Sequence, residues 1–157
     1  MKQEPAEGSA AQAVVSAGIP VLQGGEDVKL TDHGRKLDMA NIKQSLEQLM
    51  TVDGAMCAAL VDSESGMMLG STGSGVDLEI AAAGNTEVMR AKLRTMKQLG
   101  LDDRIDDVLI TLGKQYHIIR PCARQEGMFF YFVLDKSRAN LALARRKAVD
   151  VDRELQF

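Results

Sequence analysis

The feature that most constrains the fold is the run Met128–Leu134, in which every residue is aliphatic or aromatic. Successive side chains of a strand point to opposite faces of the sheet, so a strand with one wet face alternates apolar and polar residues. This run shows no alternation, and both of its faces must therefore be covered. The pattern predicts a central strand in a sheet that carries helices on both sides.

A β-hairpin is predicted earlier in the chain. Residues Ala55–Asp62 form an apolar run too short for a typical helix, and Ser63–Gly66 supplies turn chemistry before a second apolar run, Met67–Leu69. The glycine-rich segment Gly70–Gly75 is expected to break regular structure after this hairpin.

Two more strands are predicted before the central one. Val108–Leu112 and Tyr116–Arg120 are rich in β-branched and aromatic residues and are separated by a short turn at Gly113. A loop at Arg124–Gly127 then leads into Met128–Leu134. Short connections of this kind join antiparallel neighbours.

Three helices are predicted from apolar residues that recur at spacings of three and four. The first starts after the N-cap Asp38, the second runs from Asp77 to about Leu99, and the third begins after Asp135 or Ser137. Their expected inner stripes are Met39, Ile42, Leu46 and Leu49; Leu78, Ala82, Met89, Leu93 and Met96; and Leu141, Ala144, Ala148, Val151 and Leu155.

The predicted element order is αββαβββα, which indicates an α/β (α+β) domain with a five-stranded, mainly antiparallel sheet and helices on both faces. The chain has 157 residues, enough for one core. Residues 1–35 are rich in Ala, Gly, Ser and charge without a sustained period, so we expect a flexible N-terminal tail. Its one apolar island is Ile19–Leu22. Residues 36–157 are expected to form the folded domain.

The composition of the chain limits the classes of partner and ligand that it can bind. The net charge of −3, the pI near 5.4 and an aromatic share of 4 % without Trp disfavour nucleic acid binding. Cys57 and Cys122 have no metal-ligand spacing, which argues against a zinc site. No apolar run approaches the ~20 residues that span a bilayer, and the first residues do not resemble a secretion signal. A cytoplasmic protein without membrane insertion is therefore expected.

No catalytic constellation is evident. Of the two histidines, His33 falls in the tail, and His117 lies on a predicted strand, where a structural or surface role is favoured. Gly70–Gly75 lacks the Lys and Ser or Thr of a phosphate-binding loop. The acidic cluster Asp102, Asp103, Asp106 and Asp107 is expected to be solvated, and only Cys122 is a candidate reactive thiol. We expect no catalytic residue, metal or cofactor.

The long second helix is the better candidate for a binding surface. Arg90, Lys92, Arg94 and Lys97 give it a basic flank, and Met89 and Met96 add adaptable side chains, although methionines at this spacing also suit a core. The basic run Arg145–Lys147 on the last helix is the next surface to consider.

Two stretches resemble the roadblock (dynein light-chain type) family, in its bacterial-like form. They are the hairpin Ala58–Ser71 and, more specifically, Val133–Arg145, with the sequence Val-Leu-Asp-Lys-Ser-Arg-Ala-Asn-Leu-Ala-Leu-Ala-Arg. The similarity extends over roughly Lys36 to Phe157. This chain differs from a minimal family member in having a long N-terminal tail.

The resemblance implies a homodimer in which strands near Asp107–Leu112 pair edge to edge and the two long helices lie side by side. Family members include dynein light chains, scaffolds for nutrient-sensing GTPases, and bacterial proteins that activate a Ras-like gliding-motility GTPase. A non-catalytic regulator of a small GTPase, without a cofactor, is the implied function. The expected dimer interface comprises Val108, Leu109, Ile110, Leu112, Met89, Leu93 and Met96, and the expected partner surface comprises Arg90, Arg94 and Lys97.

Two alternatives stay open. A structural adaptor for a motor or filament would use the same dimer without nucleotide-dependent binding. A small-ligand sensor is the other, because profilin-like and PAS-like sheets have a similar arrangement and often enclose a pocket. Dense apolar patterning without convergent polar groups argues against the sensor.

Overall fold

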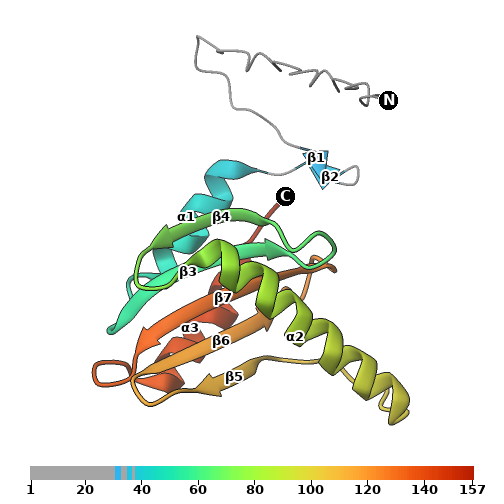
Figure 1. Cartoon of the computed structure of the whole chain (residues 1–157). Coiled ribbons are helices and arrows are strands. Elements are labelled where there is room, and N and C mark those ends of the chain that lie inside the picture. The colour runs from blue at the N-terminus through green and yellow to red at the C-terminus, as the bar shows by residue number, and fades with distance from the viewer. Residues whose placement is uncertain (1–30, 33–34, 37) are drawn as a thin grey trace, which may run out of the picture.

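The strand β7 (Met128–Asp135) is the middle strand of a five-stranded sheet in the computed structural model (Figure 1). The strand order is β4-β3-β7-β6-β5, and every neighbouring pair is antiparallel. All β7 residues except the last are buried, which confirms the prediction of a central strand. The structure describes residues 31–32, 35–36 and 38–157, so the expected tail lies largely outside the described residues.

From Met39 to Glu154 the observed order is αββαβββα, as predicted. The remaining elements are the strands β3 (Ala55–Asp62), β4 (Met68–Gly73), β5 (Val108–Thr111) and β6 (Gln115–Pro121), and the helices α1 (Met39–Leu49), α2 (Leu78–Gln98) and α3 (Leu141–Glu154). A short ladder of β1 (Thr31–Asp32) with β2 (Arg35–Lys36) precedes them.

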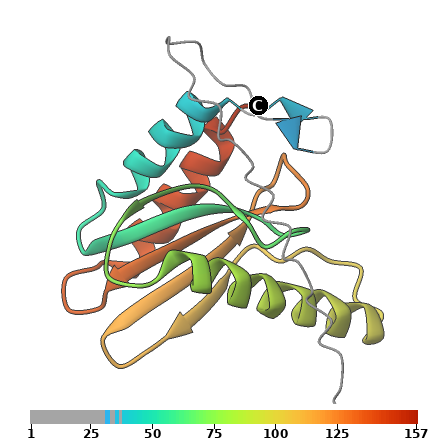
Figure 2. The same ribbon diagram turned by 45° about the horizontal axis from the view of Figure 1, so that its top comes forward.

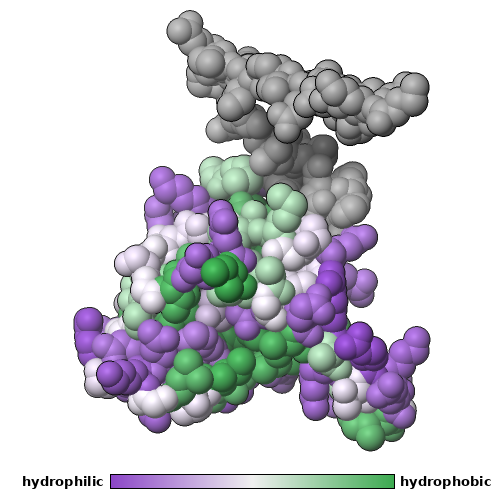
Figure 3. All heavy atoms as spheres, viewed as in Figure 1, coloured by the Kyte–Doolittle hydropathy of each residue, from purple (hydrophilic) through white to green (hydrophobic). Residues whose placement is uncertain are grey.

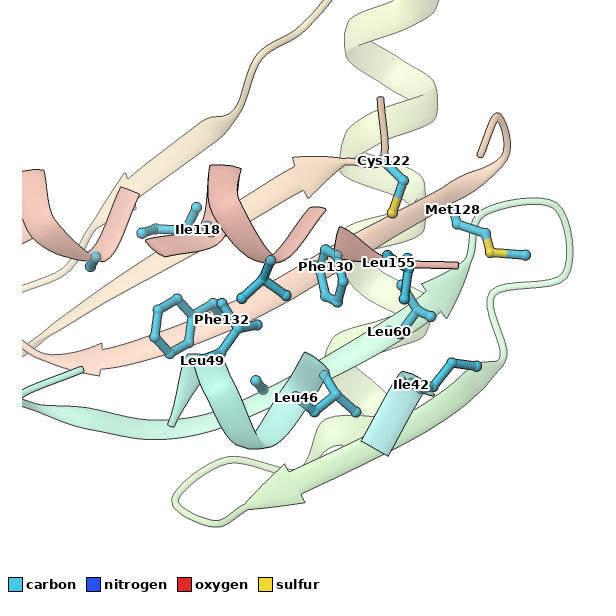
Figure 4. Packing of buried hydrophobic residues seen from close by; sticks show 14 of the residues in the cluster. Ile42, Leu46, Leu49, Leu60, Ile118, Cys122, Met128, Phe130, Phe132 and Leu155 are labelled. Atoms are coloured by element: carbon cyan, nitrogen blue, oxygen red, sulfur yellow. The ribbon is translucent and has the colours of Figure 1, made fainter. Parts of the chain in front are cut away.

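Helices cover both faces of the sheet. Figure 2 shows α1 and α3 together on one face and α2 on the other. Alternate residues of β7 supply both layers: Phe130 and Phe132 pack with α1 and α3, while Phe129 and Tyr131 pack on the α2 side. Figure 4 shows the first of these layers, in which Leu49 of α1 lies beside Phe132. The unbroken apolar run thus forms two cores at once.

The cap of α1 is the predicted one. The Asp38 carboxylate accepts hydrogen bonds from the backbone N–H groups of Ala40 and Asn41, which have no partner inside the helix. Ile42, Leu46 and Leu49 are buried as expected, whereas Met39 is partly exposed at the first turn.

The predicted start of α3 was wrong. Asn140 is the N-cap, and its side-chain oxygen accepts from the backbone N–H of Leu143. Asp135 instead accepts hydrogen bonds from the backbone N–H and the hydroxyl of Ser137. These bonds lower the pKa of the Asp135 carboxyl and form a turn before the helix.

Gly70–Gly75 was expected to break regular structure after the hairpin. It does not do so at its start, because β4 continues to Gly73. A Cβ added at Gly70 would lie 2.8 Å from Cγ2 of Ile42, so glycine allows α1 to lie directly against β4. At Gly73 the φ angle is +79°, and a Cβ would lie 2.2 Å from the Met56 carbonyl oxygen. Here the glycines permit close approach within regular structure.

In the part of the chain that the structure describes, none of the helices combines the length and the apolar character needed to cross a bilayer.

Candidate interaction surface

The helix α2 lies across the sheet face that α1 and α3 leave uncovered (Figure 1). Asp77 caps it by accepting from the N–H groups of Glu79 and Ile80. The predicted stripe residues Ala82, Met89 and Met96 are buried, which confirms that this side faces inward.

Leu93, predicted to belong to the same stripe, is 51 % exposed, so that part of the prediction was wrong. Met89 and Met96, on either side of Leu93 in the same half of α2, are buried, so the inward side of the helix is covered unevenly. An apolar residue at an inward helical position therefore remains available to solvent.

One flank of α2 carries the predicted cations Arg90, Arg94 and Lys97, which recur at helical spacing. Arg90 is held in place: its Nη2 donates to the backbone carbonyl oxygens of Ser63 at 3.1 Å and Glu64 at 2.5 Å, in the turn between β3 and β4. Its Nη1 also pairs with Glu87 at 2.6 Å. The basic flank is thus turned toward the β4 side of the sheet, with Arg94 and Lys97 exposed beside it.

The opposite flank of α2 carries apolar residues together with Lys92, which was predicted to lie with the other cations. Ala81, Val88 and Leu99 lie about two and three helical turns apart, so they share one side. Val88 is 38 % and Leu99 66 % exposed. Because Arg90 faces the β4 side, this flank faces the β5 side.

The strand β5 closes the sheet at that same side, and no strand of the described chain pairs with its outer edge. Val108 and Ile110 are half-buried on the α2 face, whereas Leu109 packs on the α1 and α3 face. Leu112 lies beyond β5, in the turn to β6, where its N–H donates to the carbonyl oxygen of Gln115. Figure 3 shows hydrophobic surface over β5 and β6 beside α2.

A hydrogen-bonded chain of polar side chains lies beneath this face. The Tyr131 hydroxyl is 2.7 Å from Nδ1 of His117, and Nε2 of His117 is 2.9 Å from Oε1 of Gln115. Burial lowers the pKa of His117. Burial also raises the pKa of Tyr131 to about 12, although a hydrogen bond with Asn85 of α2 opposes the rise. Both imidazole nitrogens are engaged, which supports the predicted structural role of His117 over proton transfer.

The surroundings of Cys122, the candidate reactive thiol, disfavour thiolate formation. Cys122 is buried in the core between β6 and α3. Burial raises the pKa of its thiol, and the negative charge of the nearby Asp152 carboxylate raises that pKa further. A thiol kept protonated is a poor nucleophile. Asp152, also buried, accepts from the Ala123 N–H at 3.0 Å and lies 3.4 Å from Nε of Arg120. This acidic and basic pair joins α3 to the end of β6.

The four aspartates of the acidic cluster differ in their surroundings. Asp102, Asp103 and Asp106 are exposed, as expected. Asp107 instead accepts hydrogen bonds from Arg145 of α3.

No family model matches this sequence, and no curated protein matches it at a significant level. Similarity is found among solved structures. MglB from Myxococcus xanthus superposes with a TM-score of 0.68 at 17 % identity over 77 % of this chain and 89 % of that chain. The gliding protein mglB from Thermus thermophilus gives a TM-score of 0.66 at 18 % identity over 74 % and 87 %.

A Roadblock/LC7 domain from Streptomyces avermitilis matches with a TM-score of 0.62 at 12 % identity, over 70 % of this chain and 90 % of that domain. Identities this low establish similarity of fold. Together with the order αββαβββα and the antiparallel sheet, these matches confirm the predicted resemblance: the chain has the roadblock-type fold.

Proposed function

We propose that this chain is a non-catalytic homodimeric protein that binds and regulates a small Ras-like GTPase. The observation that carries the proposal is the fold shared with the gliding protein MglB. The roadblock family, which the sequence resembles, includes bacterial proteins that activate a Ras-like gliding-motility GTPase. The exposed side chains of α2 supply a surface suited to that role.

The dimer forms through β5. Its outer edge offers backbone N–H and C=O groups to a second copy, and antiparallel pairing of two β5 strands would join two sheets into one. The apolar flank of α2, with Val88 and Leu99, borders the same edge. Edge pairing and helix packing therefore bury neighbouring surfaces in a single twofold interface.

The partner binds to the basic flank of α2. In a β5-paired dimer this flank lies on the outer side of each helix, because Arg90 is bonded to the turn between β3 and β4. Each protomer thus presents its own cations, rather than sharing them across the seam. Arg94 and Lys97 are the exposed members, and they suit an acidic GTPase surface, where charge chiefly raises the association rate.

Regulation acts by positioning groups of the partner. An inserted arginine that stabilises the transition state must project freely into the partner's site. Arg90 is held by two carbonyl oxygens and by Glu87, and Arg145 is engaged by Asp107. Neither of these two arginines is therefore free to insert, which supports a binding platform at their positions.

The test is capture of a partner in defined nucleotide states. The tagged full chain is incubated with lysate of its source organism, containing either a non-hydrolysable GTP analogue or GDP, and bound proteins are identified by mass spectrometry. We expect a Ras-like GTPase in one nucleotide state only. Recovery of motor or filament components alone, equal in both states, would instead support a structural adaptor.

A purified GTPase recovered in this way permits a second measurement. Its rate of GTP hydrolysis with and without the chain separates an activator from a scaffold. A faster rate identifies an activator, and an unchanged rate with state-specific binding identifies a scaffold.

A further inference from the structure

The strand β4 is the second edge of the sheet. It pairs with β3 on one side, and in the described chain no strand pairs with its outer side. Its sequence, Met68–Gly73, contains no charged residue and no proline, and its register with β3 is regular from Gly70 to Gly73. Soluble proteins usually protect edge strands with charge, proline or a covering segment. β4 has neither charge nor proline, and within the described residues its protection is limited to its short length and to the register shift opposite Leu60 and Val61, so a covering segment would protect it further.

A groove runs beside this edge, between β4 and α1. Its volume is about 150 Å³, on the scale of a side chain. The lining residues are Met39, Ile42, Lys43, Leu46 and Glu47 of α1 and Gly70, Ser71 and Thr72 of β4. Only its floor is apolar: Ile42 and Leu46 lie there, almost fully buried beside Gly70, whereas Lys43 and Glu47 are exposed along the groove. The groove therefore suits an aliphatic side chain of an extended segment.

The chain reaches the mouth of this groove from its N-terminal side. Thr31 of β1 lies opposite Lys36 of β2, two residues before the cap Asp38. The β1–β2 hairpin thus returns the preceding segment to the start of α1, where Met39 lines the groove. Residues 1–30 precede this point, and among them Ile19–Leu22 is a run of four apolar residues.

The linker between that run and β1 is long enough to place the run beside α1. The eight residues from Gln23 to Leu30 would span about 15 Å as a flexible linker. The 11 residues of α1 extend about 16 Å. A linker of this length keeps Ile19–Leu22 at an effective concentration in the millimolar range beside β4.

We propose that Ile19–Leu22 docks in the same chain along β4 and places an apolar side chain in the groove between β4 and α1. Pro20 fits this position, because proline is tolerated in an edge strand where its missing N–H faces outward. A second copy pairing through β4 would have to displace a segment already tethered there. It would also add a second interface to a dimer joined by β5, which produces open-ended assembly.

Docking has a consequence for assembly. With β4 covered, β5 is the edge that remains for pairing, and the oligomer closes as a dimer. The docked segment lies at the far edge from the β5 seam, so it leaves both the seam and the basic flank of α2 accessible.

Amide hydrogen exchange on the full chain tests the proposal. The double variant Val21→Asp/Leu22→Asp replaces two apolar side chains with carboxylates, which cannot contact the floor formed by Ile42 and Leu46 without losing their hydration. Val14→Asp/Val15→Asp is the matched control, since it makes the same change in the same segment outside the apolar run. We expect β4 amides to exchange about tenfold faster in the first variant and at the original rate in the control, with β7 amides unchanged in both.

A peptide of residues 16–25 added to the first variant should restore slow exchange at β4. Equal β4 exchange in all three proteins would overturn the proposal. Protection that falls on tenfold dilution and is insensitive to Val21→Asp/Leu22→Asp would also overturn it, and would assign the edge to a second copy.

Discussion

Arg145 of α3 and Asp107, the residue before β5, form a paired hydrogen bond in which Nε donates to Oδ2 at 2.8 Å and Nη2 donates to Oδ1 at 2.7 Å. The planar guanidinium matches the carboxylate with two parallel bonds. The Asp107 side chain is only 10 % exposed, whereas that of Arg145 is 47 % exposed. The pair fixes the start of β5 against α3 and so positions the proposed dimer edge.

Arg145→Ala should destabilise the fold, because it leaves the Asp107 carboxylate mostly buried without its donor. The expected loss is about 1–2 kcal/mol, above the contribution of an ordinary surface ion pair. Arg146→Ala is the matched control, because this neighbouring arginine of α3 is exposed. Urea unfolding measures both, and identical midpoints would show that the pair does not anchor β5.

Ile110→Pro should convert the dimer into monomers or aggregates. Proline removes an N–H group from β5 and disrupts edge pairing. Ile110→Thr keeps the N–H group and the β-branched shape, so it should remain a dimer. Size-exclusion chromatography with light scattering distinguishes the species. A proline variant that elutes as an unchanged dimer would place the interface elsewhere.

The sequence was most informative where one residue pattern has one structural solution. The uninterrupted apolar run of β7 required two covered faces, and the α1 stripe required one buried side. Gly70 was misjudged because its role depends on contact with Ile42, which is distant in sequence. The start of α3 was misjudged because Asp135, Ser137 and Asn140 are all good caps and only the local backbone selects Asn140.

The binding surface was less predictable, because side-chain contacts between distant elements decide which residues are available. The helical spacing of Arg90, Arg94 and Lys97 places them on one flank, whereas Lys92, which was predicted with them, lies on the other. It did not reveal that Arg90 is bonded to carbonyl oxygens of Ser63 and Glu64. Nor did it reveal that Leu93 stays exposed although Met89 and Met96 on the same side are buried.

A chain that begins at Lys36 should keep the fold. The described core draws its buried residues from α1 onward, and a reversibly docked segment adds little to global stability. Its thermal midpoint should lie within about 4 °C of that of the full chain. A chain beginning at Ala55 is the control and should not fold, because it lacks Ile42, Leu46 and Leu49. A much larger loss in the Lys36 chain would make the N-terminal segment part of the core.

His117 should make stability fall as the solution becomes mildly acidic. Burial lowers its pKa in the folded state, so the unfolded chain binds the proton first. The stabilisation is complete above the unfolded pKa of about 6.5 and is lost as pH falls below that value toward the lower folded pKa. His117→Asn should be less stable at pH 7.5 but show a flatter decline to pH 5.5 in urea midpoints. Parallel declines for the two proteins would exclude His117 as the cause.

Arg94→Glu/Lys97→Glu should abolish capture of the partner while leaving the dimer intact. These two cations are exposed, whereas reversing Arg90 would also break its bonds to the turn between β3 and β4 and confuse folding with binding. The matched control is Arg146→Glu/Arg153→Glu, which reverses two exposed cations on α3, across the sheet from α2. Because charge acts mainly on association, capture by the original protein should weaken as salt rises. Association rates by surface plasmon resonance at two salt concentrations measure this dependence. If the α2 variant binds as the original protein does and the α3 variant does not, the partner binds the α3 face instead.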